Sequence, residues 1–263
     1  MVAVGGGIPI DLAGFVAATY MRGIAHINIA TTLLAQVDAA VGGKTAINAT
    51  QGKNLIGAFH PPAAVIADPR LLDTLPKREF RAGLYEVVKY GVIASRPLFE
   101  RLVTDLPRIF AREPEIMTAI VADSCRIKAE VVAADEREGD RRRILNYGHT
   151  AGHALEAVTG YRRLRHGEAV AYGMLVAAHL GVARGLIDKS DHAALVELIG
   201  RMGPLPQVTD LPAAEVLDAM RRDKKVVAGR LHMVLPRGLG DTVIVDDVTE
   251  KESRQALKSI GVR

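Results

Sequence analysis

The stretch from residue 1 to residue 15, MVAVGGGIPIDLAGF, constrains the fold more than any other part of the chain. A short apolar run leads into three glycines, and an acid and a helical pattern follow. This order is typical of a phosphate-binding strand-to-helix turn, because glycines let the backbone approach the ligand and the helix N-terminus supplies oriented N–H groups. The turn does not match GxGxxG, and Pro9 removes one N–H donor. An ordinary tight turn with Asp11 as a helix N-cap therefore stays open.

Short strands alternate with helices in the first quarter of the sequence. The patterns predict strands over 2–4, 26–30 and 64–68, a helix over 11–21, and a helix that begins after an N-cap at Thr31 or Thr32. Strands that alternate with helices favour a parallel α/β sheet. The segment 42–62 is polar and turn-rich. It is too long for an idle connection, so we expect it to line a site.

The pattern becomes helical from Pro76 onward. Apolar residues recur at helical spacing in five segments up to residue 203. Residues 231–236 and 241–247 are predicted to pair as a hairpin, and Thr249 with Glu252 forms a capping-box pattern before a last helix. The sequence thus predicts two domains, an α/β domain over 1–75 and a mainly helical domain over 76–263.

Composition excludes several classes of protein. With 49% hydrophobic residues in 263, the chain can bury a sizeable core. The net charge of +4 indicates a solvated basic face or a site for small anions. A nucleic-acid surface is disfavoured, because no run of five basic residues and no interleaved aromatics occur. The single Cys125 indicates a reduced, cytoplasmic protein, and neither a membrane-spanning stretch nor a signal peptide is visible.

Two stretches carry charged residues that suit phosphate chemistry. The segment VDAAVGGKTAINATQGKN gathers Asp38, Lys44, Lys53 and Asn54 in one glycine-rich region. Two lysines near a nucleotide turn suit phosphate groups, although solvated loop lysines remain the plain alternative. Further on, GLYEVVKYG places an acid and a lysine three apart on one helix face, where an exposed ion pair is the alternative.

A histidine pattern indicates a metal centre. His149 and His153 lie four apart in NYGHTAGHALE, and His166 follows at the head of the next helix. Two or three imidazoles with one acid are the ligand set of a catalytic zinc site that keeps a position open. No HExxH is present, and packing or capping histidines remain the alternative.

Nearby, DEREGDRRRILN offers arginines that could hold a carboxylate, but spacing does not choose among them. RRDKKVVAG poses the same question for its lysines.

Taken in order, these stretches resemble 3-dehydroquinate synthase of the sugar-phosphate cyclase superfamily. The resemblance rests on "GGG…DLAGF", "TTLLAQVD..VGGKT.IN...GKN.IGAF", "LP.REF.AGL.EV.KYG", "KAEVV..DERE", "LN.GHT.GHA.E" and "HGEAVA.GM". Their order and spacing match over nearly the whole chain. The resemblance implies part of a Rossmann-like NAD-binding α/β domain followed by a mainly α-helical metal-binding domain.

The resemblance also implies a reaction. The substrate would be 3-deoxy-D-arabino-heptulosonate 7-phosphate, and the products would be 3-dehydroquinate and phosphate. NAD would oxidise the C5 hydroxyl and later be regenerated, so that phosphate is eliminated, the ring opens and an aldol step closes the carbocycle. A divalent ion, zinc or cobalt, would polarise the developing ketone. The step belongs to the shikimate pathway of aromatic amino acid biosynthesis.

Residue roles follow from the same resemblance. The metal ligands would be Glu86, His149 and His166. The NAD contacts would be Gly5, Gly6, Gly7, Ile8, Asp11, Thr31, Thr32, Lys44, Lys53, Leu71, Leu72, Asp73 and Thr74. The substrate and catalytic positions would be Arg22, Asp38, Lys44, Lys53, Asn54, Lys89, Lys128, Arg142, Asn146, His149, His153 and either Lys224 or Lys225. Arg22 would reach the phosphate site of a neighbouring subunit, which implies a homodimer.

Three other interpretations stay open. One is a sister cyclase that acts on another sugar phosphate, and another is a metal-dependent polyol dehydrogenase of related fold. The third is an inactive remnant, because position 10 is Ile where the family usually has Gly, and because the upstream nucleotide domain is absent. At roughly 30 residues per βαβ unit, on the order of 90 residues are lacking. We therefore expect weak NAD binding and poor or no turnover, with strand 2–4 at an exposed sheet edge.

Overall fold

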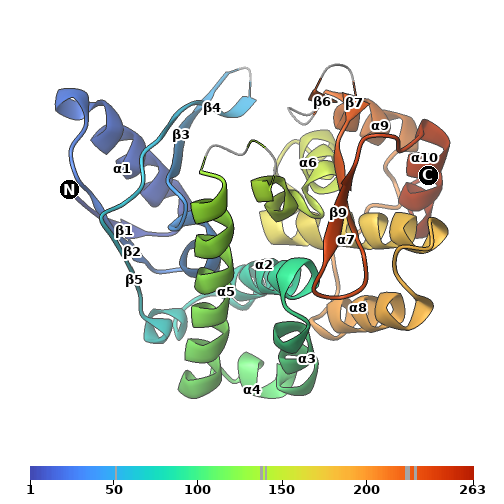
Figure 1. Ribbon diagram of the computed structural model, residues 1–263, viewed down its shortest axis with the longest axis horizontal. Coiled ribbons are helices and arrows are strands. Elements are labelled where there is room, and N and C mark those ends of the chain that lie inside the picture. The colour runs from blue at the N-terminus through green and yellow to red at the C-terminus, as the bar shows by residue number, and fades with distance from the viewer. Residues whose placement is uncertain (51, 137–138, 140, 223–225, 228–229) are drawn as a thin grey trace. The chain divides into compact units, whose positions relative to one another are not determined.

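The computed structural model describes residues 1–50, 52–136, 139, 141–222, 226–227 and 230–263 (Figure 1). The chain forms two compact units. The first comprises Met1–Val87 and Pro107–Arg142, and the second comprises Val88–Leu106 and Arg143–Arg263. Helix α2 (Lys77–Ala94) contributes to both units. The expected fold class, an α/β part followed by a mainly helical part, is confirmed, whereas the domain boundary at residue 75 stays a prediction.

A three-stranded parallel sheet forms the centre of the first unit. Its strands β1 (Val2–Gly5), β2 (Ile27–Ala30) and β5 (Ala64–Ala67) lie in the order β1-β2-β5. These are the three strands that the sequence predicts. Helix α1 (Gly7–Thr19) and the π-helical turn η2 (Ala35–Ala39) pack on one face of the sheet through small apolar side chains. This close packing explains why alanines dominate that face.

The glycine turn connects β1 to α1. Gly6 is the N-cap of α1, so the helix begins four residues earlier than the sequence pattern predicts. Pro9 lies in the first turn, where an N–H has no partner within the helix. Gly5 has no room for a side chain, since a Cβ atom there would lie 2.8 Å from Pro9 Cγ. Ile10 is 2% exposed and packs against Ala3 and Ala30, so the side chain at this unusual position belongs to the core.

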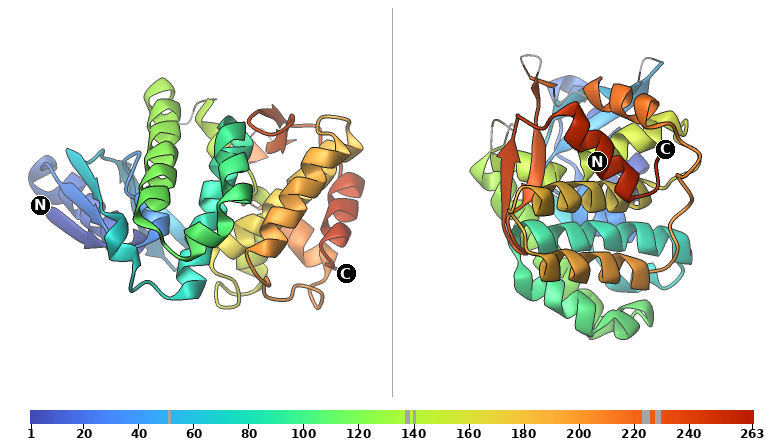
Figure 2. Two further views of the ribbon diagram at one scale, coloured as in Figure 1. Left: turned by 90° about the horizontal axis from the view of Figure 1, so that it is seen from below. Right: turned by 90° about the vertical axis from the view of Figure 1, so that its right-hand side faces the viewer.

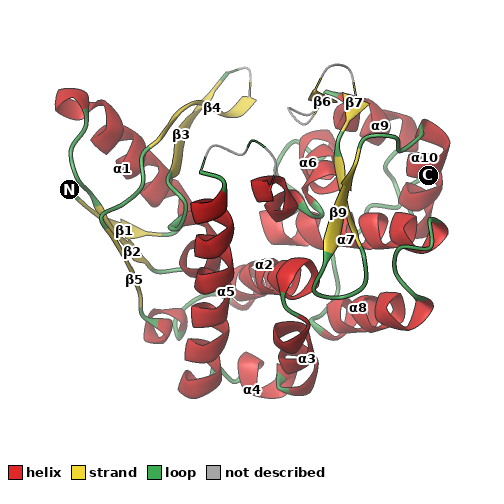
Figure 3. Ribbon diagram, viewed as in Figure 1, coloured by secondary structure: helices red, strands yellow, loops and turns green. Residues whose placement is uncertain are grey.

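The region expected to be a site-lining loop contains an antiparallel hairpin instead. Strands β3 (Lys44–Ala49) and β4 (Gly52–Phe59) pair along this stretch, as Figure 3 shows in yellow. The Thr45 hydroxyl donates to the Ala58 carbonyl across the pair at 3.1 Å. Sequence reasoning missed the hairpin because its Gly, Asn and Lys residues are depleted in strands. What holds the hairpin is its packing on α1.

The remaining elements of the first unit are mostly helical. They are η1 (Tyr20–Arg22), η3 (Pro69–Leu72), α4 (Leu106–Phe110) and α5 (Pro114–Ala134). Helix α5 packs on η2 and η3. It thereby brings its basic residues to the segment that follows β2.

The second unit is built around α7 (His166–Ala183), which packs on α6 (His149–Val158), α8 (Lys189–Arg201) and α10 (Glu250–Ser259) (Figure 2). Helices α6, α7 and α8, together with α2 and α5, match the five predicted periodic segments. The predicted hairpin is β8 (Met233–Pro236) with β9 (Thr242–Val245), and the predicted capping box begins α10. The other elements are α3 (Arg96–Thr104), η4 (Arg141–Asn146), α9 (Ala213–Arg221), β6 (Val226–Val227) and β7 (Arg230–Leu231).

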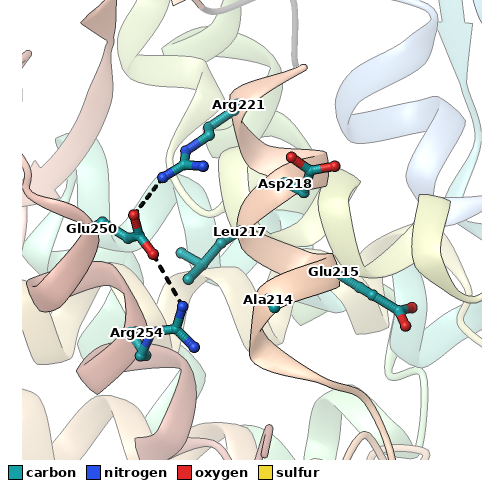
Figure 4. Close-up of a pocket in the computed structure, with 7 residues that line it drawn as sticks. All are labelled: Ala214, Glu215, Leu217, Asp218, Arg221, Glu250 and Arg254. Carbon is teal, nitrogen blue, oxygen red and sulfur yellow. Dashed lines mark hydrogen bonds and ion pairs between the residues drawn. The ribbon is translucent and has the colours of Figure 1, made fainter.

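A surface cleft of about 400 Å³ lies between α9 and α10 (Figure 4). Glu250 lies between two arginines there. It accepts from Arg221 at 2.5 Å and from Arg254 at 3.0 Å. The Arg221–Glu250 pair joins the two helices, whereas the Arg254–Glu250 pair lies within α10. None of the predicted site residues lines this cleft.

Candidate active site

Three histidines of the second unit converge. His149 begins α6, His153 follows one turn later, and His166 begins α7. Their ligand atoms all lie within 4.8 Å of one another, and their ring centroids are 5.2 to 5.8 Å apart. Packing or capping alone does not require three imidazoles to converge in this way. The three histidines thus converge as their spacing predicts, and their role as metal ligands stays a prediction.

The orientation of two imidazoles fits metal binding. His166 Nδ1 lies 3.0 Å from Glu156 Oε2, and His149 Nδ1 lies 3.0 Å from the Tyr147 carbonyl oxygen. An Nδ1–H that donates to each oxygen leaves the Nε2 lone pair for a ligand. Metal-binding histidines are usually oriented by such carboxylate and carbonyl partners. The side chains that this arrangement requires are therefore present.

Sequence reasoning assigned no role to the two residues that orient these imidazoles. Glu156 lies three positions after His153 on α6, and its side chain is buried. The Tyr147 hydroxyl donates to the Met174 carbonyl at 3.1 Å, which fixes the segment before α6 to α7. The sequence did offer a signal for Glu156, because an acid one helical turn after His153 lies on the same helix face as that histidine.

Glu86 and Lys89 are buried side chains of α2. Glu86 is fully buried, and Lys89 is 1% exposed with its Nζ 4.8 Å from the Tyr90 ring centroid. The alternative of an exposed ion pair is therefore wrong. Glu86 belongs to the first unit and the histidines belong to the second. Its role as a metal ligand stays a prediction, as does the substrate role of Asn146 at the end of η4.

The first unit gathers four more of the predicted site residues, two acids and two cations. Lys128 of α5 donates to the backbone carbonyl of Asp38 at 2.6 Å and also to its carboxylate. Asp11 of α1 lies close enough to interact with both. Arg142 is 2% exposed, and its guanidinium donates to the Gly42 carbonyl at 2.8 Å. A side chain at position 42 would collide with that guanidinium, since a Cβ atom would lie 3.0 Å from it.

The pKa of Asp11 is raised from the ordinary 3.8 to about 6. Burial of the carboxyl is the largest cause, the Asp38 carboxylate raises the pKa further, and Lys128 lowers it. Between pH 4 and pH 6 the folded chain thus holds a proton that the unfolded chain has released. The contribution of Asp11 to stability is therefore present below about pH 4 and is lost as the pH rises through about 6.

This electrostatic arrangement gives a prediction. Asp38→Asn should lower the pKa of Asp11, because a neighbouring negative charge is removed, and Lys128→Met should raise it, because a cation is removed. Titration of the Asp11 carboxyl carbon by NMR measures both shifts. Asp73→Asn, a change in another acid of the same unit, is the control and should leave the pKa unchanged. Equal pKa values in all four proteins would contradict the arrangement.

The predicted cofactor residues lie on three segments of the first unit. Gly5, Gly6, Gly7 and Ile8 form the turn into α1, and a Cβ atom at Gly6 would lie 3.1 Å from the Thr32 side chain. The Thr32 hydroxyl accepts from the Ala35 N–H at 3.2 Å and so caps the helical segment that begins at Leu33 and continues into η2, as predicted, while Thr31 precedes it. Leu71, Leu72, Asp73 and Thr74 lie in and after η3. Arg112, which sequence reasoning missed, donates to the carbonyls of this segment.

The other predicted residues are placed as follows. Arg22 ends η1 and is exposed, Lys44 begins β3, and the Asn54 N–H donates to Asn48 Oδ1 at 3.1 Å in the hairpin. The Lys53 side chain, Lys224 and Lys225 lie outside the described residues. Their cofactor and substrate roles stay predictions.

Comparison with known proteins places the chain among sugar-phosphate cyclases. The family model described as 3-dehydroquinate synthase N-terminal matches residues 1–82, and the one described as 3-dehydroquinate synthase C-terminal matches residues 83–226. The 3-dehydroquinate synthase of Solibacter usitatus is 50% identical over 98% of this chain and 72% of its own length. That of a Synechococcus strain is 49% identical over 99% and 72%.

Solved structures give a consistent result. A Streptomyces hygroscopicus 2-epi-5-epi-valiolone synthase with NAD⁺ and Zn²⁺ bound matches with a TM-score of 0.89 and 29% identity, over 98% of this chain and 72% of that one. A 2-deoxy-scyllo-inosose synthase with carbaglucose-6-phosphate, NAD⁺ and Co²⁺ matches with a TM-score of 0.87 and 30% identity, over 98% and 73%. A sulfoacetaldehyde reductase, at 17% identity, shares the fold alone. Among the described residues, no helix is long and apolar enough to cross a membrane.

Proposed function

Because this chain belongs to the 3-dehydroquinate synthase family, we propose that it acts as a phosphate-eliminating lyase on 3-deoxy-D-arabino-heptulosonate 7-phosphate. The products are 3-dehydroquinate and phosphate. The observation that carries the proposal is the convergence of three imidazoles within 4.8 Å. These imidazoles belong to a chain that is about 50% identical to several 3-dehydroquinate synthases.

The proposed cofactors are a divalent metal and NAD. When bound, the metal supplies a Lewis acid for a substrate oxygen, and NAD accepts and returns a hydride. His149 and His166 hold the metal through their Nε2 atoms, with Glu86 as the predicted third ligand. The glycine turn and the first N–H groups of α1 bind the pyrophosphate. The presence of NAD⁺ with Zn²⁺ or Co²⁺ in two neighbouring structures supports this assignment.

The charged residues suit a doubly anionic substrate. Lys128 and Arg142 are cations held at defined positions, so much of their contribution is the placement of phosphate and carboxylate groups. His153 contacts substrate beside the two metal-binding imidazoles. Because these side chains are held in place, we expect them to orient the reacting carbons of the substrate as well as to bind it.

The alternatives are supported less well. The sister cyclases share 29 to 30% of their residues with this chain, against 48 to 50% for several 3-dehydroquinate synthases. The matched dehydrogenases and reductases, at 14 to 19% identity, share only the fold.

The reaction is tested by its products. With zinc and NAD added, we expect phosphate release from the heptulosonate phosphate without net NADH, with the Solibacter enzyme run in parallel as the positive control. Sedoheptulose 7-phosphate is the matched control and should release none. Accumulation of NADH, or preference for the control substrate, would overturn the proposal in favour of a dehydrogenase or a sister cyclase.

We further propose a homodimer, which the surface of α1 supports. Ile8, Leu12 and Val16 form an exposed apolar stripe at i, i+4 spacing, and Ile8 is 84% exposed. Beyond α1, Tyr20 and Met21 are also exposed, and they precede Arg22, the residue expected to reach a neighbouring subunit. Leu12→Glu should therefore halve the mass measured by light scattering. Val196→Glu, at an exposed valine of α8, should not. A dimer that persists in Leu12→Glu would contradict this interface.

A further inference from the structure

The segment that follows β5 leaves the parallel sheet at the same edge as the glycine turn. The strand register places Gly5, Ala30 and Ala67, the last residues of the three strands, in one row. The glycine turn follows β1 at this carboxyl edge, and η3 follows β5. Ligands of open parallel α/β sheets bind outside the carboxyl ends of the strands. Residues 71–75 therefore lie on the side of the sheet where the proposed function places NAD.

One side chain holds the backbone of this segment. The Nη1 atom of Arg112, in the connection between α4 and α5, donates to the Leu72 carbonyl at 2.5 Å and also to the Asp73 carbonyl. Its Nη2 atom donates to the Leu75 carbonyl at 2.5 Å. The carbonyls of Asp73 and Leu75 lie beyond the end of η3, where no further turn of that helix supplies a donor.

The guanidinium of Arg112 is itself fixed in place. Its central carbon lies 4.8 Å from the centroid of the Phe80 ring, which is 2% exposed. A guanidinium over an aromatic face at this distance makes a favourable cation–π contact. The edge of the planar group thus binds carbonyls while its face rests on a buried ring. A lysine would not replace it, because an ammonium is a point charge without the planar fork.

The segment that Arg112 holds presents its other side chains to solvent. Leu71, Asp73 and Thr74 are exposed, whereas Leu72 between them is fully buried. Leu72 therefore anchors the segment in the core, and Arg112 sets the direction of the peptide groups that follow. Without the guanidinium, these carbonyls would turn toward water, since backbone acceptors require a partner. The exposed side chains would turn with them.

We propose that Arg112 is a positioning residue for the cofactor, which fixes the backbone of residues 72–75 so that Asp73 and Thr74 are oriented for NAD. The inference rests on the proposed function, because it takes NAD as the ligand at this edge of the sheet. The guanidinium is engaged with protein carbonyls, so it acts on NAD only through this segment.

The test measures NAD binding to the full 263-residue chain by titration calorimetry. In Arg112→Met the dissociation constant for NAD should rise at least tenfold. Arg126→Met is the matched control and should leave it unchanged, because the ion pairs of Arg126 with Asp123 and Glu130 lie within α5. Loss of folded protein raises the apparent dissociation constant only in proportion to the fraction lost. A tenfold rise in a variant that urea unfolding shows to be mostly folded therefore reports positioning.

A second variant separates the guanidinium from the backbone. Arg112 has a φ of 58°, which glycine adopts without strain, so Arg112→Gly removes the side chain at little cost to the fold. We expect added methylguanidinium to restore part of the NAD affinity of this variant and to have no effect on Arg126→Met. An unchanged dissociation constant in Arg112→Met and Arg112→Gly would overturn this proposal alone. Absence of NAD binding to the unaltered chain would overturn the cofactor assignment, and this proposal with it.

Hydrogen exchange locates the effect in the chain. The amides of residues 73–75 should exchange at least tenfold faster in Arg112→Met than in the unaltered chain, and NAD should no longer protect them. The amides of β9 in the second unit should be unchanged. Protection of residues 73–75 by NAD that persists in Arg112→Met would contradict the positioning role.

Discussion

Replacing His166 with alanine is expected to weaken zinc binding by more than about 100-fold. His166 provides one of the imidazoles that converge within 4.8 Å, and Glu156 fixes its orientation. Removal of an outer partner alone typically costs 10- to 100-fold in metal affinity, and loss of a ligand costs more. Glu156→Gln should therefore fall in that lower range. Competition with a chromophoric chelator measures both variants.

Two further variants decide the composition of the ligand set. Glu86→Gln should abolish tight zinc binding if Glu86 is the third ligand, whereas His153→Ala should then leave zinc affinity nearly unchanged and reduce turnover. His179→Ala, at a histidine outside the cluster, is the matched control. The reverse pattern, with zinc binding lost in His153→Ala and retained in Glu86→Gln, would identify His153 instead of Glu86 as the third metal ligand.

The elements that were predictable are those with a strong local period. The three strands of the parallel sheet, the long helices and the β8–β9 hairpin follow the sequence pattern closely. The β3–β4 hairpin was not predictable, because its turn-forming residues signal a loop and only tertiary packing on α1 makes them strands. The early start of α1 has a similar cause, since Ile10 is drawn into the core between helix and sheet.

The candidate site was predictable where spacing along a helix brings residues together. His149 and His153 needed only the helical period, and His166 needed the recognition that α7 begins there. Glu156 was missed because a buried acid that orients a histidine has no signature of its own. Arg112 was missed for the same reason, since it acts on backbone carbonyls that any sequence provides.

The distance between α6 and α7 is set by glycines, and this packing holds the histidines together. A Cβ atom at Gly173 of α7 would lie 1.7 Å from the Gly148 carbonyl oxygen, far inside any permitted contact. A Cβ atom at Gly152 would lie 2.9 Å from the Ala169 carbonyl oxygen. Both obstacles are backbone atoms, so no side chain can rotate away. The two helices therefore approach as closely as they do only because these positions lack side chains.

Gly173→Ala is accordingly expected to destabilise the chain by about 3 kcal/mol, the upper end of the range for overpacking. The shift of α7 away from α6 should also weaken zinc binding, because His149 and His166 start these two helices. Gly200→Ala is the matched control, since a Cβ atom at this exposed position of α8 meets nothing within 4 Å. It should stabilise the helix by about 0.5 to 1 kcal/mol. Urea unfolding measures both changes. Equal stability of the two variants would show that the close approach of α6 and α7 does not depend on a glycine at position 173.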